Sequence, residues 1–372
     1  MRFLFFTGGW TAGGMEAAFL SLMKGLAARG HCPAAVVSGW NDGQVPGLLR
    51  DAGIPHHEVP LGRLYLTNPL FTWHSLRHMP VARRQLRAIA AEVRPDWIVS
   101  PDVQTLLLSA GLLPGRRALF LQSPPERLMR NRWAGRLLDR RLDRVLCVSR
   151  FIAEAARATP IDPAKLALVP NGVALPADRR FVARRPVRLG IVGRIVEQKQ
   201  HAVLIEACAL LRSRLPGAFR LDIVGPEEGA AAAGLVARIE ELGLGDCVRW
   251  VGWVADRERL YGSLDVVVAP AVDEPFGLTV PEAGAHGLPV VAARSGAFPE
   301  LVEDGVTGLL FAPRDAADLA WALERLVGDP GLRERLGRAG RAHVAAHFGI
   351  GTMTDRFLAA CDVGAPPVAG AA

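Results

Sequence analysis

The sequence predicts an α/β protein of two domains, each built around a parallel β-sheet. The chain has 372 residues, and because domains usually contain roughly 100–200 residues, two are expected. Of these residues, 50% are hydrophobic, which is enough to form a large core. Short apolar runs alternate with amphipathic stretches along most of the chain, and this alternation is the pattern of βαβ units.

The N-terminal half starts this alternation at its first residues. Short apolar runs predict strands at Phe3–Phe6, Ala34–Val37, Trp97–Val99, Ala118–Leu121 and Val145–Val148. Amphipathic stretches between them predict helices, for example at Met15–Ala28 and Val81–Glu92. Strands that alternate with helices favour parallel pairing, so this half is expected to form one Rossmann-like domain.

The C-terminal half repeats the same rhythm. Strands are predicted at Val187–Val192, Phe219–Val224, Val248–Val251 and Asp265–Ala269. Helices are predicted at about His201–Leu215 and Ala230–Leu242, with a short helix before the last of these strands. This half is therefore expected to form a second Rossmann-like domain.

The domain boundaries follow from breaks in the pattern. The stretch from Pro170 to Pro186 is rich in Pro, Arg and small residues and lacks periodicity, as expected of a linker. The last ten residues are mostly small and predict a disordered tail. We expect an N-terminal domain over residues 1–170, a linker over 171–186, a C-terminal domain over 187–350, a helix over 351–362 and the tail over 363–372.

The net charge of +7 is unevenly distributed. Residues 1–170 carry 22 Lys and Arg against 12 Asp and Glu, whereas residues 171–372 carry 22 against 25. Ten arginines lie between Arg116 and Arg150. A basic half suits an anionic partner, such as a membrane surface, and a solvated arginine-rich surface is the alternative. Nucleic acid is not expected, because no DNA- or RNA-binding motif accompanies the charge.

The cysteines and histidines show no metal-binding or disulfide spacing. The five cysteines lie far apart at positions Cys32, Cys147, Cys208, Cys247 and Cys361. The pairs His56–His57 and His74 with His78 lack a third ligand at a suitable spacing. No stretch approaches the roughly 20 apolar residues that a membrane span needs. We therefore expect a cytoplasmic protein without a metal, either free or bound to the inner face of the cytoplasmic membrane.

A glycine-rich loop, Gly8–Gly14, lies between the first predicted strand and helix. Glycines let the backbone approach a ligand closely, and the start of a helix offers N–H groups to a phosphate or sugar oxygen. A tight turn that simply needs glycine is the alternative. The loop does not fit the dinucleotide-binding pattern, which disfavours a dinucleotide-dependent oxidoreductase.

A second motif, Gly193–Lys199, follows the first strand of the C-terminal domain. It places Arg194 and Lys199 beyond the carboxyl end of that strand, where open α/β sheets bind ligands. A departing diphosphate needs positive charge, which Arg supplies as a bidentate donor and Lys as a point charge. An exposed basic loop is the alternative.

A third motif contains two glutamates, Glu274 and Glu282, eight positions apart. Between them a loop through Phe276 and Leu278 leads into a helix expected to begin near Thr279. Carboxylates at these two places can accept hydrogen bonds from sugar hydroxyls, while the N–H groups of the loop meet phosphate or sugar oxygens. For Glu282, a favourable charge at the helix N-terminus is the alternative.

The run Glu274–Phe311 resembles the signature of glycosyltransferase family 4, a group of retaining enzymes with the GT-B fold. Residues 8–31, 145–154, 168–173 and 189–199 fit the same family pattern in order. The resemblance thus spans most of the chain. It implies a GT-B architecture, in which two Rossmann-like domains with parallel sheets face a cleft.

The resemblance also implies roles for individual residues. Glu274 would bind donor-sugar hydroxyls, Glu282 the ribose hydroxyls, and Arg194 with Lys199 the diphosphate. The other donor-binding positions would be Gly193, Gly252, Trp253, Phe276, Gly277, Leu278 and Thr279. Gly13, Gly14 and Gln122 would line the acceptor and diphosphate side. A C-terminal helix at about Gly351–Cys361 would pack on the first domain.

Three positions depart from the family pattern. Gln122 stands where many relatives carry His, and an amide can donate hydrogen bonds but cannot serve as a general acid or base. Gln200 replaces the usual glycine after Lys199, and Ala174 replaces a common Asp. The first departure removes a catalytic histidine from that position.

The resemblance implies transfer of a sugar from a nucleotide-diphosphate donor to a hydroxyl of a glycan or lipid-linked glycan, as in surface polysaccharide or lipopolysaccharide-type biosynthesis. The reaction would need no metal or other cofactor and would retain the anomeric configuration. A non-catalytic, nucleotide-sugar-binding partner subunit of a glycosyltransferase is the alternative. A sugar-nucleotide epimerase of the same fold is a third interpretation, which the Glu274–Phe311 run disfavours.

Overall fold

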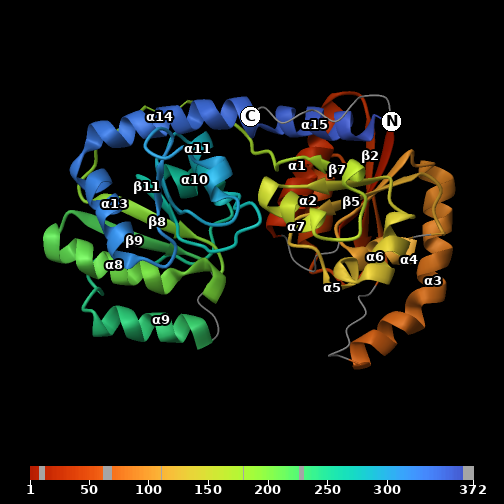
Figure 1. Cartoon of the computed structure of the whole chain (residues 1–372), viewed down its shortest axis with the longest axis horizontal. Helices are drawn as coiled ribbons and strands as arrows, with labels where there is room; N and C mark the ends of the chain where they lie inside the picture. The colour runs from red at the N-terminus through yellow and green to blue at the C-terminus, as the bar shows by residue number, and fades with distance from the viewer. Residues whose placement is uncertain (8–12, 62–68, 110, 179, 226–229, 363–372) are drawn as a thin grey trace. The chain divides into compact units, whose positions relative to one another are not determined.

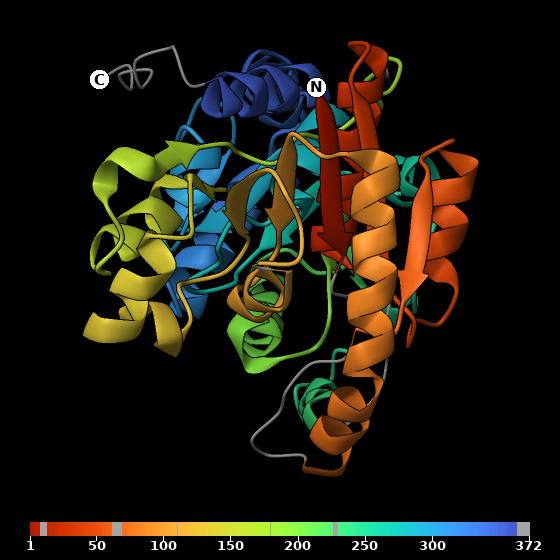
Figure 2. The same ribbon diagram turned by 90° about the vertical axis from the view of Figure 1, so that its right-hand side faces the viewer.

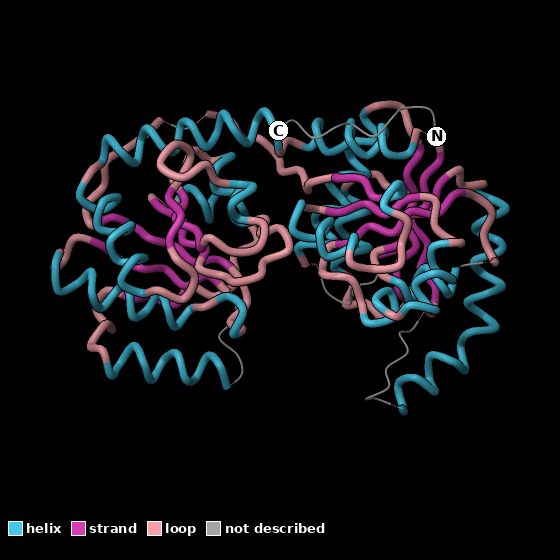
Figure 3. The backbone as a smooth tube through the Cα atoms, viewed as in Figure 1, coloured by secondary structure: helices cyan, strands magenta, loops and turns pink. Residues whose placement is uncertain are grey.

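The computed structural model describes the chain except for residues 8–12, 62–68, 110, 179, 226–229 and 363–372 (Figure 1). It divides into two compact units. Unit 1 contains Met1–Gly172 and the chain from Ile350 onward, and unit 2 contains Val173–Gly349. Within each unit, helices surround a parallel sheet (Figure 3), so the predicted α/β class is confirmed. The predicted C-terminal tail lies outside the described residues.

The sheet of unit 1 has seven strands in the order β3-β2-β1-β4-β5-β6-β7. The strands are β1 (Arg2–Thr7), β2 (Cys32–Ser38), β3 (His56–Val59), β4 (Trp97–Ser100), β5 (Arg116–Leu121), β6 (Arg144–Cys147) and β7 (Leu166–Leu168). Phe3 of β1 lies opposite Pro33 on one side and Trp97 on the other, in parallel register. The strand order reverses between β1 and β4, and the carboxyl ends of strands at such a reversal are the usual ligand position of open α/β sheets.

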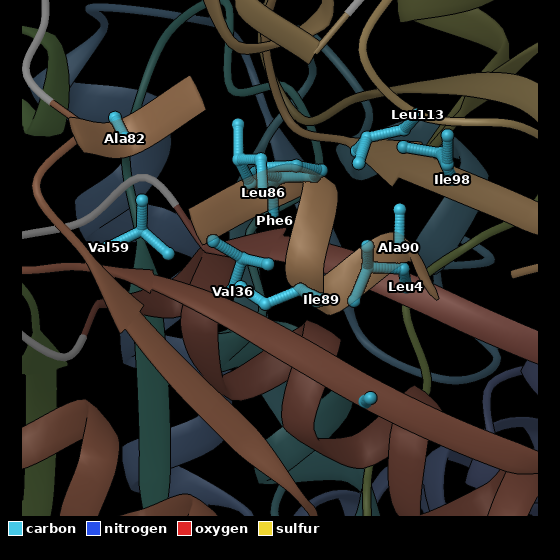
Figure 4. Packing of buried hydrophobic residues seen from close by; sticks show 11 residues of the cluster. Leu4, Phe6, Val36, Val59, Ala82, Leu86, Ile89, Ala90, Ile98 and Leu113 are labelled. Atoms are coloured by element: carbon cyan, nitrogen blue, oxygen red, sulfur yellow. The ribbon is translucent and has the colours of Figure 1, made fainter. Parts of the chain in front are cut away.

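The helices of unit 1 pack on both faces of this sheet. They are α1 (Gly14–Ala28), α2 (Gln44–Asp51), α3 (Pro69–Val93), α4 (Val103–Ser109), α5 (Arg127–Arg130), α6 (Arg132–Asp139), α7 (Arg150–Arg157) and α15 (Ile350–Cys361). Helix α3 lies alongside the sheet (Figure 2) and packs Leu86 and Ile89 against Leu4, Phe6 and Val36 (Figure 4). Burial of these apolar side chains fixes the helix to the sheet.

Helix α15 belongs to unit 1 although unit 2 separates it from the rest of that unit in the sequence. Its Phe357 is fully buried, with the ring centroid 5.3 Å from that of Phe3 and 6.0 Å from that of Phe5. Asp355 forms an ion pair of 2.8 Å with Arg29, the residue that follows α1. The C-terminal helix therefore completes the core formed by the first strand of the chain.

The sheet of unit 2 has six strands in the order β10-β9-β8-β11-β12-β13. They are β8 (Val187–Val192), β9 (Phe219–Val224), β10 (Val248–Trp250), β11 (Val266–Ala269), β12 (Val290–Ala293) and β13 (Leu309–Phe311). The order reverses between β8 and β11, which are paired in parallel. Chain connections leave these two strands in opposite directions, and the gap at their carboxyl ends is the usual ligand position of such sheets.

The helices of unit 2 are α8 (His201–Arg214), α9 (Ala230–Glu241), α10 (Arg257–Gly262), α11 (Thr279–Ala285), α12 (Phe298–Leu301), α13 (Ala316–Gly328) and α14 (Pro330–His347). Two short 3-10 helices, η1 (Pro163–Lys165) in unit 1 and η2 (Glu197–Lys199) in unit 2, complete the elements. Of the segment expected to be a linker, residues from Val173 onward belong to unit 2. There Arg184 pairs with the buried Asp265 at 3.2 Å. No described helix is long and apolar enough to cross a membrane.

Candidate functional site

Two loops meet at the carboxyl ends of β8 and β11 in unit 2. Gly193 directly follows β8, and the loop that contains Glu274 follows β11. The N–H of Val272 donates to the carbonyl of Gln198 at 2.9 Å, and the Gln198 side chain donates to the carbonyl of Asp273 at 3.2 Å. These bonds hold the second and third motifs side by side at the switch point of the sheet.

The centre of this site is an ion pair between Lys199 and Glu274. The Lys199 Nζ lies 3.0 Å from Oε2 of Glu274, and the two side chains are only 25% and 13% exposed. Partial burial strengthens the attraction between opposite charges relative to that in water. The structure thus brings together a cation and a carboxylate that lie 75 positions apart in the sequence.

Close packing fixes the backbone around Glu274. Gly277 has a φ of +81°, and a Cβ there would lie 2.4 Å from the ring of Phe298. Gly296 approaches so closely that its Cβ would lie 2.5 Å from the carbonyl oxygen of Glu274. The same oxygen accepts a hydrogen bond of 2.9 Å from the N–H of Ala297. Because glycine alone fits both positions, the carboxylate is held on a rigid turn.

Glu282 lies in the first turn of α11, which begins at Thr279 as the sequence predicts. The hydroxyl of Tyr261 donates to its Oε2 at 2.5 Å, and Nε of Arg257 lies 3.8 Å from its Oε1. Tyr261 is fully buried. Burial raises its pKa well above the ordinary value, and the negative charge of Glu282 raises the pKa further. Tyr261 therefore remains a hydrogen-bond donor that orients the Glu282 carboxylate.

An exposed tryptophan lies next to this carboxylate. The guanidinium of Arg257 lies 5.5 Å from the ring centroid of Trp253, which is 62% exposed. Gly252, just before it, has a φ of +75°, and its carbonyl accepts a hydrogen bond from the N–H of Gly225 at 3.1 Å. Arg257 thus links the Trp253 ring to Glu282.

Arg194 and the Phe276–Thr279 segment occupy the same edge of the sheet. The Arg194 side chain is exposed, and among the described residues its guanidinium has no hydrogen-bond or ion-pair partner. Phe276 is buried against Phe348, with ring centroids 6.1 Å apart. Its side chain therefore belongs to the core, and only its backbone is left to contact a ligand. Beyond Thr279, the first turn of α11 has no free N–H group: that of Val280 donates to the carbonyl of Gly277 at 3.0 Å, Pro281 has none, and that of Glu282 donates to the carbonyl of Leu278 at 2.9 Å.

The residues of unit 1 that were predicted to line the acceptor side, Gly13, Gly14 and Gln122, make contacts within that unit. The N–H of Gly13 donates to the buried Glu16 at 3.0 Å, and Gly14 begins α1. Residues 8–12 of the glycine-rich loop lie outside the described part of the chain. Gln122 and Asn171 exchange two hydrogen bonds, of 3.1 and 2.8 Å, between their side-chain amides. Both oxygens and both nitrogens of this pair are therefore already engaged within unit 1.

Sequence reasoning missed several of these residues. Tyr261 and Arg257 lie on the short helix α10, and Asn171 lies at the start of the segment that was expected to be a linker. Nothing in their local sequence signals a partner 21 or 49 positions away. Among the described residues, no group of three or more His, Cys, Asp or Glu side chains is arranged to hold a metal ion. His56 and His57 lie on the strand β3 instead.

Two units with parallel sheets, one with acidic and basic groups at its switch point, have the architecture of the GT-B fold. The family model for glycosyl transferases group 1 matches residues 180–343, and that for glycosyltransferase family 4 matches residues 12–175. The chain belongs to this family of glycosyltransferases.

Similar proteins include enzymes of surface-glycan and inositol chemistry. The chain is 29% identical to the lipopolysaccharide core biosynthesis glycosyltransferase LpsE of Rhizobium meliloti, over 93% of this chain and 95% of that protein. It is 39% identical to the D-inositol 3-phosphate glycosyltransferase of Actinosynnema mirum over 54% of this chain, and spans about half of that protein (52%). The crystal structure of HepE from Anabaena in complex with UDP has the same fold, with a TM-score of 0.77 at 23% identity, covering 96% of this chain and 98% of HepE.

Proposed function

We propose that this protein is a retaining, metal-independent hexosyltransferase. It transfers a sugar from a nucleotide-diphosphate donor to a hydroxyl of a glycan or lipid-linked glycan. The observation that carries the proposal is the Lys199–Glu274 pair at the switch point of the unit 2 sheet, with Glu282 one short loop away. The similarity to LpsE over nearly the whole chain supports an acceptor of the lipopolysaccharide or surface-polysaccharide type.

In this proposal the diphosphate of the donor lies against Arg194 and Lys199. Arg194 is exposed, and Lys199 is held by a carboxylate until the donor arrives. As the bond between the sugar carbon and the diphosphate breaks, negative charge grows on the leaving oxygen. The two cations, with Gly193 and the backbone N–H groups of residues 276–279 beside them, stabilise that charge.

Glu274 and Glu282 hold the hydroxyl groups of the donor. Glu274 accepts hydrogen bonds from the sugar, next to the reacting carbon. Tyr261 occupies Oε2 of Glu282, so Oε1 is the atom available to the ribose hydroxyls. The nucleotide base of the donor lies at Gly252 and Trp253. The exposed ring of Trp253 already has the guanidinium of Arg257 over it. Gly13, Gly14 and Gln122 lie on the acceptor side.

The chemical step needs no protein nucleophile. The acceptor oxygen forms a bond to the anomeric carbon on the face from which the diphosphate departs, and a phosphate oxygen takes the acceptor proton. Retention of configuration follows. The contributions of the protein are positioning and electrostatic stabilisation. We do not assign a covalent role to Glu274, because its carboxylate is paired with Lys199.

The proposal is tested by the substitution Glu274→Ala. We expect transfer to fall by about a hundredfold or more, because a contact to the reacting sugar is lost. Glu258→Ala, at an exposed glutamate of α10 in the same unit, is the matched control and should leave activity unchanged. Full transfer activity of Glu274→Ala on the physiological acceptor would refute the assignment.

The donor is identified first by thermal shift against UDP-, GDP- and ADP-sugars, because a ligand that binds only the folded protein raises its melting temperature. Transfer and slow donor hydrolysis are then measured by mass analysis of the products. A donor that binds but is never cleaved would favour the non-catalytic partner subunit. An isomerised donor would reveal an epimerase.

A further inference from the structure

Helices α5 and α6 form an exposed surface that the proposed reaction does not use. The two helices follow β5 of unit 1 after a short loop, on the side of the sheet at which the strands end (Figure 2). We call this surface the α5–α6 face. It consists of Arg127, Leu128, Arg130, Arg132, Trp133, Arg136, Leu137, Arg140 and Arg141.

Large apolar side chains stand out on this face. Trp133 is 74% exposed and Leu137 is 60% exposed, and they lie one helical turn apart on α6. Gly135 and Leu138, on the opposite side of α6, are buried. A Cβ at Gly135 would lie 2.6 Å from the carbonyl oxygen of Met129, so the inner side of the helix is packed tightly. The helix is therefore fixed with its tryptophan and leucine directed at solvent.

The arginines of the face are not neutralised. All six are exposed, and over the described residues none of their guanidinium groups has an ion-pair or hydrogen-bond partner. Asp139, the one acid between Arg127 and Arg141, is engaged with Lys165 at 3.0 Å. Arg136 and Arg140 repeat at helical spacing beside the stripe of Trp133 and Leu137. The result is a dense positive charge around an apolar centre.

A second exposed tryptophan, on unit 2, lies on a surface of different charge. Trp321 of α13 is 54% exposed and has Arg325 over its ring at 4.8 Å. Its helix also carries Asp318 and Glu324, and Glu324 pairs with Arg214 at 2.8 Å. That surface is mixed in charge, whereas the α5–α6 face is basic throughout. Trp321 therefore provides a matched control.

We infer that the α5–α6 face docks unit 1 on an anionic lipid bilayer. Trp133 and Leu137 enter the headgroup region, where the amphipathic indole ring is favoured, and the arginines pair with lipid phosphates. A soluble polyanion would engage the arginines but would leave the two apolar side chains in water, so the observations favour a bilayer. Docking does not depend on sugar transfer, and it would hold unit 1 where lipid-linked acceptors are concentrated.

The test is flotation of the purified full-length chain with vesicles of phosphatidylcholine, with or without phosphatidylglycerol. The wild-type protein should float only with the anionic vesicles, and added salt should weaken binding. Arg132→Gln with Arg136→Gln should weaken binding about fivefold for each arginine lost. Trp133→Ala with Leu137→Ala should weaken it about tenfold, because apolar insertion is lost.

Matched controls lie on unit 2. Trp321→Ala and the pair Arg220→Gln with Arg335→Gln, at exposed arginines, should bind vesicles like the wild type. Circular dichroism checks that each variant is folded. The thermal shift with the donor should be the same in all variants, which separates failure of docking from failure of the proposed function.

Three outcomes of the flotation assay would overturn the inference. They are no flotation of the wild type, unchanged flotation of Trp133→Ala with Leu137→Ala, and flotation lost instead through Trp73→Ala, at the exposed tryptophan of α3. Equal competition by soluble polyphosphate in the wild type and in the Trp133→Ala, Leu137→Ala variant would identify a polyanion partner and would also overturn it.

Discussion

Gln200 adopts a left-handed backbone conformation, with a φ of +54° and a ψ of +39°. Residues with a Cβ avoid this region by roughly 1–2 kcal/mol, whereas glycine enters it freely. The family pattern has glycine at this position, and the structure gives the physical reason. In this chain the Gln200 side chain donates to the carbonyl of Glu197 at 2.8 Å, which closes the turn that carries Lys199.

The next residue, His201, is a buried histidine directly behind Lys199. It is 4% exposed, and neither of its ring nitrogens has a hydrogen-bond partner among the described residues. Burial lowers the pKa of His201 to about 4, and the positive charge of Lys199 lowers it further. The ordinary value is 6.5, so His201 stays neutral in the folded protein at pH values at which the unfolded chain becomes protonated.

We predict that the free energy of unfolding decreases as the pH falls from about 6.5 toward 4. The stability linked to His201 is fully present above its pKa in the unfolded chain, 6.5, and is lost as the pH falls toward its pKa in the folded protein, about 4. At pH 5 the loss should be about 2 kcal/mol. Denaturant unfolding of the wild type and His201→Leu at several pH values measures it. An equally steep pH dependence in His201→Leu would show that other groups are responsible.

At the scale of elements, close contact between α14 and the end of α11 positions Glu282. A Cβ on Gly337 would lie 2.1 Å from the carbonyl oxygen of Gly287, and one on Gly284 would lie 2.8 Å from Val344. Gly287 ends the turn that leads from α11 into β12. Glycines therefore set the separation of α11 and α14. That separation in turn determines the position of the Glu282 carboxylate.

We predict that Gly337→Ala pushes α14 away from this turn. The free energy of unfolding should fall by about 1–3 kcal/mol, as for other overpacked interiors. Donor binding in the thermal-shift assay should weaken as well, because α11 moves with its glutamate. Gly328→Ala, at the end of α13, is the control, since a Cβ there meets nothing within 4 Å. Equal stability of the two variants would contradict this explanation.

Apolar runs were a good guide to the buried strands. Val187–Val192 and Phe219–Val224 have the predicted bounds, and β1 extends the predicted strand by one residue at each end. The strand β3 was not predicted, because its sequence HHEV is polar and it lies at the edge of the sheet. The strands β7 and β13, with three residues each, are too short to show periodicity.

The site was predictable only in part for a related reason. Lys199 and Glu274 could be placed, because each lies in the segment that follows a recognisable strand and parallel strands end at one edge. The pairing of Tyr261 with Glu282, or of Gln122 with Asn171, depends on side-chain directions in the packed units. A one-dimensional pattern of apolar residues does not encode those directions.

At the scale of the whole molecule, α15 ties the end of the chain to its beginning. Phe357 is fully buried against Phe3 and Phe5, at the centre of the unit 1 core. Because α15 follows unit 2 in the sequence, unit 1 is complete only after unit 2 has been synthesised. The stability of unit 1 should therefore depend on residues at the far end of the chain.

We predict that Phe357→Ala destabilises unit 1 by about 3–5 kcal/mol, since a large buried side chain leaves a cavity. Calorimetry should show an earlier transition for unit 1, while a bound donor continues to raise the transition of unit 2. Asp355→Ala, on the exposed side of the same helix, removes only a surface ion pair and should have little effect. A single transition that shifts as a whole would contradict this separation.

The chain enters and leaves unit 2 at neighbouring points. The N–H of Val173 donates to the carbonyl of Phe348 at 2.8 Å, and Val173 forms a parallel bridge with Gly349. Unit 2 is thus one continuous insertion into unit 1, and its two ends are hydrogen-bonded to each other. A unit with adjacent ends can be removed, or replaced by the corresponding unit of a relative, by changing the chain at two neighbouring positions. In the proposed function unit 2 binds the donor, so recombination at residues 173 and 349 would be a direct route to chimeras that combine a new donor preference with the original unit 1.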